Sequence, residues 1–230
     1  MTLRFVCINA NNYQSRGVEY ANKLYDMVSR NLKGGMEGEF WCFTDDYYAN
    51  RSAVAEYHKN IHLFPLPGLE LKGWFNKLAL FRPGLFDTGD RIVYLDLDTL
   101  ICGPLEPLAE YDGLFAACGD FFYPGQLQSA VMAWHAGYGL EIWYEYVWAG
   151  RPDVPGGDQV WIQKHVEKYD VLQDLYPGMF VSYKATGGRI PETASVVCFH
   201  GHPRPHEVLS GWVPEVWKIG GLTRAALDTM

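Results

Sequence analysis

Two acidic side chains separated by one residue, Asp96 and Asp98, follow a short apolar run in RIVYLDLDTLICGPL (91–105). Residues 92–95 combine β-branched, aliphatic and aromatic side chains, which predicts a buried strand of a largely parallel sheet. Open α/β sheets bind ligands beyond the carboxyl ends of their strands, so these aspartates stand where chemistry is expected. Residues two apart on an extended chain point to the same side, so both carboxylates can converge on one hard divalent cation such as Mg²⁺ or Mn²⁺.

The motif alone leaves a second interpretation open, because an acidic strand end is often a solvated turn. Here the apolar strand runs directly into Asp-Leu-Asp-Thr-Leu (96–100), and Gly-Pro-Leu (103–105) turns the chain away. In this context the segment resembles the Asp-x-Asp segment of GT-A glycosyltransferases, most closely that of family 8. The resemblance covers most of the chain. It implies a metal-dependent enzyme that moves a sugar from a nucleotide-sugar donor, with Mn²⁺ or Mg²⁺ as cofactor.

The composition is that of an ordinary globular protein, with 48% apolar and 20% charged residues in a chain of 230. This length suits one α/β domain with a full core or two small ones. Neither the length nor a linker decides between the two, and the resemblance implies a single GT-A type domain over residues 1–230. The net charge of −8 disfavours broad binding to a polyanion. Aromatic residues reach 15%, which suits either sugar-binding faces or a dense aromatic core.

Neither a membrane anchor nor a disulfide framework is expected. No apolar run approaches the ~20 residues of a membrane span, and the apolar start of MTLRFVCINANNY is too short for the core of a signal peptide. We therefore expect residence in the cytoplasm. The five cysteines lack Cys-x-x-Cys spacing, which argues against disulfides and a zinc cluster. Cys7, Cys42 and Cys198 fall in expected strands and are interpreted as small core side chains.

The N-terminal pattern predicts a strand over 3–9, a helix over 17–32 and a second strand over 39–44. Strand, helix, strand is the nucleotide-binding half of a Rossmann-like fold. The Gly-x-Gly-x-x-Gly fingerprint is absent, which argues against a dinucleotide enzyme. Together with the resemblance, this pattern predicts an α/β fold of the GT-A (Rossmann-like) type, with a central, mostly parallel mixed sheet flanked by helices.

Apolar spacing predicts the remaining elements. They are an edge strand over 61–66, strands over 113–117, 126–134, 179–184 and 195–199, and helices near 53–57, 75–81, 138–149, 158–165, 212–219 and 222–227. The helix over 138–149 should bury Leu140, Trp143, Tyr144 and Val147. The two C-terminal helices should cover the sheet.

The resemblance implies that the loop after the first strand holds the base and ribose of the donor, on Ala10, Asn11 and Tyr13. Asn11 could hydrogen-bond a base edge or serve as a turn or cap residue, since Asn favours both. Asp45 and Asp46, at the end of the next strand, are open to the same two interpretations. Both strand ends are therefore candidates for nucleoside binding.

Three further segments match the family in register. Lys77 corresponds to a basic residue near the donor phosphates, the alternative being a lysine that lies along the surface. Gln128 and Ser129 take the polar positions of the family's Asn-Ser-Gly-Val-Met strand and would face the sugar. Asp158 and Gln159 correspond to an Asp-Gln pair that reaches the transferred sugar, although Asp158 could instead cap the helix that begins there. The resemblance thus implies catalytic roles for Asp158, Gln159 and Gln128, and donor binding by Lys77 and Ser129.

The sequence FHGHPRPH (199–206) resembles the closing motif of the family, His-x-Gly-x-x-Lys-Pro-Trp. Gly201, Arg204 and Pro205 match in register, with Arg in place of Lys and His206 in place of Trp. The resemblance therefore implies that Gly201 and Arg204 bind the donor, with Arg204 on its phosphates.

The family's closing histidine is a metal ligand, but here the aligned position holds Phe199 and His200 follows one residue later. If the turn accommodates this offset of one residue, we expect Asp96, Asp98 and His200 as the metal ligands. Otherwise we expect an enzyme that uses only two protein ligands, Asp96 and Asp98. A three-histidine zinc site is less expected, because it would leave the two aspartates unexplained.

The expected donor is a UDP-sugar, and the resemblance implies retention of the anomeric configuration. The acceptor stays open between a glycan, a protein, a small molecule and a modified base of nucleic acid, and so does the oligomeric state. A nucleotidyltransferase is an alternative, but it normally carries a glycine-rich loop after the first strand, and residues 10–17 contain one glycine. A non-catalytic nucleotide- or carbohydrate-binding protein is another alternative, which a test of donor hydrolysis separates from an enzyme.

Overall fold

The computed structural model describes residues 2–32, 38–66 and 71–227, which form a layered α/β fold. A seven-stranded sheet runs through its centre in the order β3-β2-β1-β4-β7-β6-β8. Its strands are β1 (Leu3–Asn9), β2 (Gly38–Thr44), β3 (Ile61–Pro65), β4 (Arg91–Leu95), β6 (Phe115–Gly119), β7 (Leu127–His135) and β8 (Asp170–Val171). The mixed sheet and the edge position of β3 agree with the sequence-based prediction.

Most strand pairs of the central sheet are parallel. β1 pairs in parallel with β2 on one side and with β4 on the other, whereas β7 pairs antiparallel with β4 and β6. The chain therefore leaves β1 towards β2 and β3, and then returns to the opposite side of β1 for β4. Such a reversal opens a crevice beyond the carboxyl ends of the two strands, where open α/β sheets bind ligands.

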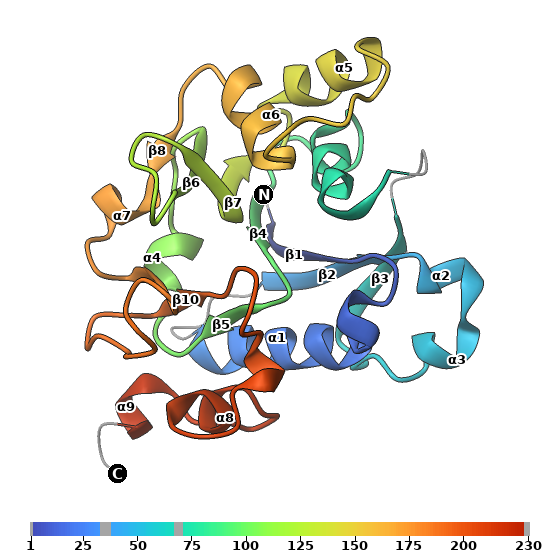
Figure 1. Ribbon diagram of the computed structural model, residues 1–230. Helices are drawn as coiled ribbons and strands as arrows, with labels where there is room; N and C mark the ends of the chain where they lie inside the picture. The colour runs from blue at the N-terminus through green and yellow to red at the C-terminus, as the bar shows by residue number, and fades with distance from the viewer. Residues whose placement is uncertain (1, 33–37, 67–70, 228–230) are drawn as a thin grey trace.

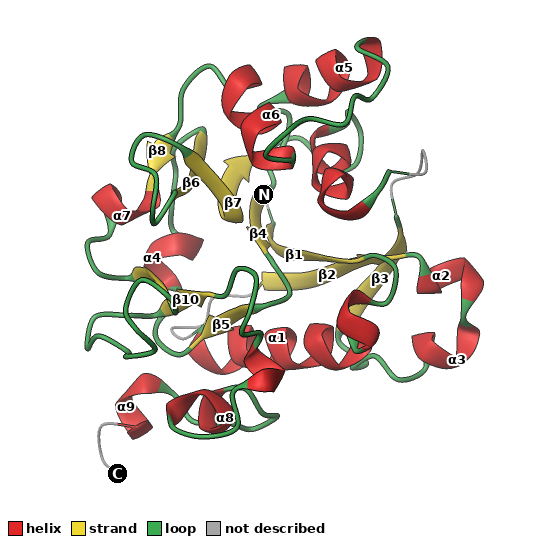
Figure 2. Cartoon of the chain, in the orientation of Figure 1, coloured by secondary structure: helices red, strands yellow, loops and turns green. Residues whose placement is uncertain are grey.

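Helices cover both faces of the sheet (Figure 1, Figure 2). The long helix α1 (Gly17–Asn31) packs on one face, while the other face is covered by η2 (Gly73–Phe81), α5 (Leu140–Trp148) and α6 (Asp158–His165). Within β1, Phe5 belongs to the core on the α1 side and Val6 to the core on the opposite side. Burial of both faces explains why the central strands are almost continuously apolar.

A second sheet carries the C-terminal part of the chain to the crevice. Its order is β5-β10-β9, with β5 (Thr99–Ile101), β9 (Phe180–Ser182) and β10 (Val196–Cys198). β10 runs antiparallel to β5, and Cys198 pairs with Thr99. The residues that follow Cys198 therefore emerge beside Asp98, the residue before β5. Strand pairing thus brings two distant parts of the sequence to one edge.

The helix α8 (Trp212–Val216) packs outside α1 rather than on the sheet (Figure 1). The ring of Trp217, which follows α8, lies 4.9 Å from that of Tyr20 and 3.5 Å from the Lys23 ammonium. Arg30 of α1 donates to a backbone carbonyl at the end of α8. The expectation that this helix covers the sheet is therefore wrong, because α1 already occupies that face.

The buried face of α5 also differs from the expected one. Ile142, Trp143 and Tyr146 are buried, whereas Tyr144 is exposed and Leu140 and Val147 are half-buried. The physical reason is that α5 packs against two neighbours. Tyr146 stacks on Phe75 of η2, with ring centroids 5.6 Å apart, and the indole N–H of Trp161 in α6 donates to the carbonyl of Ile142.

The remaining elements are short. The helix expected near 53–57 is replaced by α2 (Asp46–Ala49) and α3 (Arg51–Val54), and the others are η1 (Tyr13–Ser15), α4 (Glu106–Ala109), α7 (Leu172–Leu175), η3 (Pro205–Glu207) and α9 (Arg224–Leu227). All five cysteines are buried and free, as expected for core side chains. None of the helices in the part of the chain that the structure describes has the length and apolar character needed to cross a membrane.

Candidate active site

The two aspartates lie at the crevice, Asp96 directly after β4 and Asp98 directly before β5. Backbone hydrogen bonds fix the turn between them: the Asp96 N–H donates to the carbonyl of Ala130 (2.8 Å), and the Thr99 N–H donates to the carbonyl of Asp96 (3.0 Å). Asp98 is buried, whereas the side chain of Asp96 is 27% exposed. The two carboxylates therefore occupy different environments, and each has its own cation.

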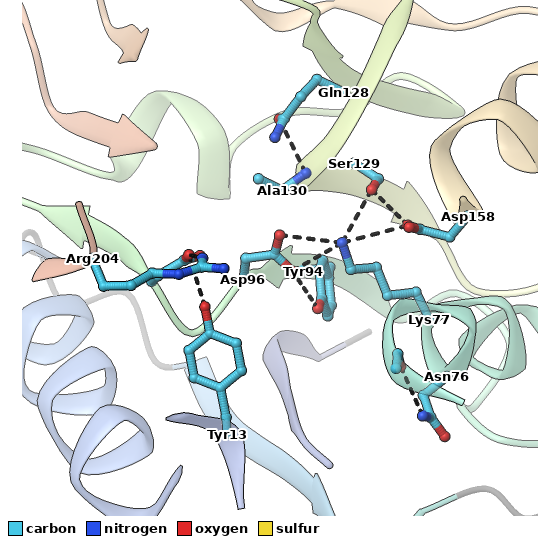
Figure 3. A network of polar contacts seen from close by, with 12 residues as sticks. Tyr13, Asn76, Lys77, Tyr94, Asp96, Gln128, Ser129, Ala130, Asp158 and Arg204 are labelled. Atoms are coloured by element: carbon cyan, nitrogen blue, oxygen red, sulfur yellow. Dashed lines mark hydrogen bonds and ion pairs between the residues drawn. The ribbon is translucent and has the colours of Figure 1, made fainter. Parts of the chain in front are cut away.

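Lys77 is the cation of Asp96 (Figure 3). Its Nζ lies 2.9 Å from Oδ1 of Asp96 and 3.4 Å from Oδ2 of Asp158, and it donates to Oγ of Ser129 (3.0 Å). The Tyr94 hydroxyl donates to Oδ1 of Asp96 (2.7 Å). Burial lowers the pKa of Lys77, but the charges of Asp158 and Asp96 outweigh burial and raise that pKa above its ordinary value. Lys77 is thus a buried, charged member of the cluster and does not lie along the surface.

Asp158 opens α6 without capping it. The helix has no side-chain cap hydrogen bond, and the Asp158 carboxylate instead accepts from the Ser129 hydroxyl (2.6 Å). Both side chains are buried. Because Lys77 comes from η2, Ser129 from β7 and Asp158 from α6, three distant segments meet at this point (Figure 3).

Arg204 is the cation of Asp98. Its guanidinium pairs with Oδ2 of Asp98, and the Tyr13 hydroxyl donates to the same oxygen (2.9 Å). The guanidinium also lies over the Tyr13 ring, 5.5 Å from its centroid. Burial and the negative charge of Asp96 raise the pKa of Asp98 to about 6, against the opposing effects of Arg204 and Tyr13. The charge of Asp96 therefore adds to burial in disfavouring the ionisation of Asp98.

The loop after β1 has an unusual backbone conformation. Asn11, Asn12, Gln14 and Ser15 have φ values of 56°, 47°, 54° and 56°, in the left-handed region that residues other than glycine seldom adopt. Such conformations persist only where the surroundings impose them, and they cluster at functional sites. Ala10, at the start of this loop, is half-buried, whereas Asn11 is exposed.

Asn9, the last residue of β1, holds this loop in place and was not singled out from the sequence. Its Oδ1 accepts from the Tyr13 N–H (3.0 Å), while its Nδ2 donates to the Tyr57 hydroxyl (2.6 Å) and to Oδ2 of Asp46 (3.2 Å). The signal was available, since a polar residue closes an apolar strand here as it does at Asp96. Asp46 is part of this buried network and so has a structural role.

Asp45 has a different environment from its neighbour. One carboxylate oxygen, Oδ2, accepts from the Asn11 N–H (2.7 Å). The other, Oδ1, is buried and has no hydrogen-bond partner within the described residues. Asp45 thus tethers the loop after β1 and keeps one acceptor for a further donor.

His200 lies in a pocket of about 250 Å³ that Gln128 and Gln159 also line. Its Nε2 shares a hydrogen bond with Oγ of Ser182 (2.7 Å), and the ring of Phe121 lies parallel to the imidazole with centroids 6.2 Å apart. Burial, together with the nearby Lys184 charge, lowers the pKa of His200. The pocket therefore combines two amides, an imidazole and an aromatic face, which are groups that can contact a sugar.

Gly201 makes the turn between β10 and Arg204. Its φ is 69°, and a Cβ at this position would lie 3.1 Å from Nζ of Lys184. A glycine is therefore favoured by the backbone geometry alone. Gly201 is exposed.

The donor set fits a hard divalent cation that is shared with a phosphate. Asp96 and Asp98 supply carboxylate oxygens and repel each other electrostatically, and Mg²⁺ in proteins is commonly held by one or two carboxylates together with substrate phosphates and water. In the part of the chain that the structure describes, no three His, Cys, Asp or Glu side chains gather closely enough to hold a metal by themselves. The role of His200 as a third ligand stays a prediction.

Comparison with known proteins gives a fold but no family. No protein-family description and no curated protein matches the sequence. Among solved structures, an active-site mutant of LgtC is similar at 16% identity and a TM-score of 0.66, with 93% of each chain covered. The glycosyltransferase GlyE of Streptococcus pneumoniae is similar at 16% identity and a TM-score of 0.67, and the bifunctional glycosyltransferase WbbM at 15% and 0.66.

This chain has the GT-A fold. At such low identity the likeness extends to the fold alone. The chain is matched over its whole length by GlyE and over 94% by WbbM, but it spans only 62% of GlyE and 51% of WbbM.

Proposed function

We propose that this protein is a glycosyltransferase, a single domain that moves a sugar from a nucleotide-sugar donor, expected to be a UDP-sugar, to an acceptor. The observation that carries the proposal is the pairing of each carboxylate of the Asp-x-Asp turn with its own cation at the crevice between β1 and β4: Lys77 with Asp96, and Arg204 with Asp98. The similarity in fold to LgtC, a galactosyltransferase solved with donor and acceptor sugar analogues, supports it.

The two cations are suited to hold a diphosphate. Arg204 offers a planar fork that can contact two phosphate oxygens, whereas Lys77 supplies a compact positive charge. Both are already charged and oriented by Asp98 and Asp96, so little reorganisation is needed when phosphate oxygens arrive. Tyr13, next to Arg204, would lie beside the nucleoside, with Ala10 and Asn11 from the same loop.

Asp96 and Asp98, with His200 as the expected third ligand, would hold the Mg²⁺ or Mn²⁺ ion. Such an ion, when bound, neutralises the charge that develops on the departing diphosphate. Lys77 and Arg204 pair with the same two carboxylates.

The transferred sugar would occupy the pocket lined by Gln128, Gln159 and His200. Loss of the diphosphate leaves an oxocarbenium-like sugar, which needs stabilisation of positive charge more than it needs a strong base. Asp158, fixed by the Ser129 hydroxyl, supplies a negative charge at the border of this region. We expect retention of the anomeric configuration at the sugar.

A melting-temperature screen tests the proposal. UDP should raise the melting temperature only when Mg²⁺ or Mn²⁺ is present, because the diphosphate would be held jointly with the cation. Donor hydrolysis by the same preparation should depend on the cation in the same way. The absence of a response to every nucleoside diphosphate would contradict the proposal.

A further inference from the structure

A larger cavity, of about 580 Å³, opens beside the candidate active site. It is formed by the start of η2, by Tyr146 of α5 and by the loop that follows α5. Its volume is in the range of small-molecule sites. None of the residues assigned to the donor or the metal lines it, so it has no role in the proposed function so far.

Three aromatic side chains, Trp74, Phe75 and Tyr146, line the cavity. Trp74 is 61% exposed, whereas Phe75 and Tyr146, which also line the cavity, are buried. Behind it, Phe75 and Tyr146 stack with ring centroids 5.6 Å apart and an interplanar angle of 15°. A large flat ring kept at the surface presents an apolar face to whatever enters.

Two observations connect the cavity with the cluster formed by Lys77, Ser129 and Asp158. Trp74 lies on η2, one turn before Lys77. Its indole also packs against Gly157, where a Cβ would lie 2.6 Å from the indole nitrogen. Gly157 immediately precedes Asp158, so Trp74 is linked to that cluster through η2 on one side and through Gly157 on the other. A ligand on Trp74 would therefore lie next to the place where the sugar is released.

Three charged residues line the cavity: Lys72, Arg151 and Asp153. Burial raises the pKa of Tyr146, Asp153 raises it further, and Arg151 lowers it. An apolar ring face with a carboxylate at its edge matches a pyranose ring, whose C–H face is apolar and whose hydroxyls radiate from the rim.

We infer that this cavity is the acceptor subsite, and that it binds a pyranose ring of a glycan acceptor stacked on Trp74 with a hydroxyl donating to Asp153. The inference rests on the proposed function and names its acceptor class. A nucleic-acid acceptor would also stack on Trp74, but the net charge of −8 disfavours the approach of a phosphate backbone.

Saturation-transfer NMR on the whole protein, with Mg²⁺ and UDP present, tests the inference. The probes are methyl β-D-glucopyranoside, methyl β-D-galactopyranoside, maltose and cellobiose, with an oligothymidine as the nucleic-acid probe. At least one sugar should bind, and Trp74→Ala should weaken its binding about tenfold, which corresponds to about 1.4 kcal/mol. Trp74→Phe should retain part of the binding, and Asp153→Asn should weaken it severalfold.

Trp148→Ala is the matched control, because Trp148 is 78% exposed on α5 and does not line the cavity. It should bind sugar like the unchanged protein. The melting shift caused by UDP and Mg²⁺ should also persist in the Trp74 variants, and if Trp74→Ala fails to fold, Trp74→Phe and Asp153→Asn carry the test.

Three results would overturn the inference. They are the absence of binding of every sugar, sugar binding by the Trp74 and Asp153 variants that equals that of the unchanged protein, and binding of the oligothymidine in place of the sugars. In each case a cation-dependent response to UDP would leave the proposed transferase standing. Loss of that response in the unchanged protein would instead remove the proposed function itself.

Discussion

Ion-pair clusters occupy both ends of the central sheet, and they are built differently. At the amino end, Arg4 of β1 donates to Asp90 (2.6 Å) and pairs with Glu39 of β2, with its guanidinium 4.1 Å from the centroid of the Trp41 ring. Asp90 also accepts from the backbone N–H of Thr2 (3.0 Å). One buried cation thus joins the starts of three neighbouring strands.

At the carboxyl end the carboxylates come from one turn. Asp96 and Asp98 raise the electrostatic energy of each other, and Lys77 and Arg204 reach them from other elements. The amino-end cluster therefore ties strands together, whereas the carboxyl-end cluster holds like charges close to one another. In the proposed function the same residue types serve stability at one end and ligand binding at the other. Removal of a charge should therefore mainly lower stability at the amino end and activity at the carboxyl end.

The largest effect on stability is expected at the amino end. Arg4→Met leaves Asp90 buried without its cation and should lower the free energy of unfolding by about 3 to 5 kcal/mol. Urea unfolding measures this change, and donor hydrolysis per folded molecule should be unaffected. Arg4→Met combined with Asp90→Asn should recover part of the loss, and a double variant as unstable as the single one would contradict the assignment.

At the carboxyl end the loss should appear in activity. Asp96→Asn and Asp98→Asn each remove a charge on which the cation and diphosphate depend, and each should lower kcat for donor hydrolysis by about a hundredfold to a thousandfold. Their losses of unfolding free energy should be smaller than that of Arg4→Met. Metal titration of both variants and of His200→Ala and His202→Ala then identifies the ligands. A loss confined to His202→Ala would assign the third ligand to that histidine.

Burial of Asp98, together with the charge of Asp96, predicts that stability depends on pH. Since the folded pKa of Asp98 is about 6, above its unfolded value, the stability from its bound proton is complete below about pH 4 and is lost as pH rises through 6. With divalent cations chelated, the free energy of unfolding should fall by about 2 to 3 kcal/mol from this source. Urea titrations at a series of pH values should show no such decrease for Asp98→Asn. If the unfolding free energy of the variant depends on pH as that of the unchanged protein does, the raised pKa of Asp98 is refuted.

The smallest effect on function is expected from Arg204, which would contact the donor phosphates in the proposed function. Arg204→Ala should weaken UDP binding by about 1 to 3 kcal/mol, the scale of a charge-assisted hydrogen bond. Arg204→Lys should lose less, because it keeps the charge without the planar fork. Calorimetric titration with UDP and Mg²⁺ measures both, and equal affinity in Arg204→Ala would mean that the 199–206 segment has another task.

Much of the fold could be predicted from local patterns. Apolar runs closed by polar residues located β1, β2 and β4 within a residue or two, because strands buried on both faces leave a strong signal. The prediction of which face of α5 is buried was incorrect. This helix packs against both η2 and α6, so its buried residues do not form one apolar stripe. Single-sequence periodicity carries no information on which neighbours a helix will meet.

For the site, residue types indicated the aspartates, and the resemblance indicated Lys77, Ser129 and Asp158, which the structure gathers around one ammonium. Neither indicated that Asp96 pairs with Lys77 and that Asp98 pairs with Arg204. That distribution depends on the pairing of β10 with β5 and on the left-handed loop held by Asn9. Both are long-range consequences of packing, so no local pattern encodes them.

The pairing of Arg204 with Asp98 joins residues 106 positions apart, and this separation has a consequence for biosynthesis. A chain emerging from the ribosome can form β1, β2 and β4 well before Arg204 has been added, since domains fold as their segments become available. Until then Asp98 faces Asp96 without its own counter-charge. The pairing of both carboxylates with cations is therefore among the last features of the protein to be completed. A stalled chain that lacks 199–206 would carry a formed sheet in which Asp98 has no arginine partner.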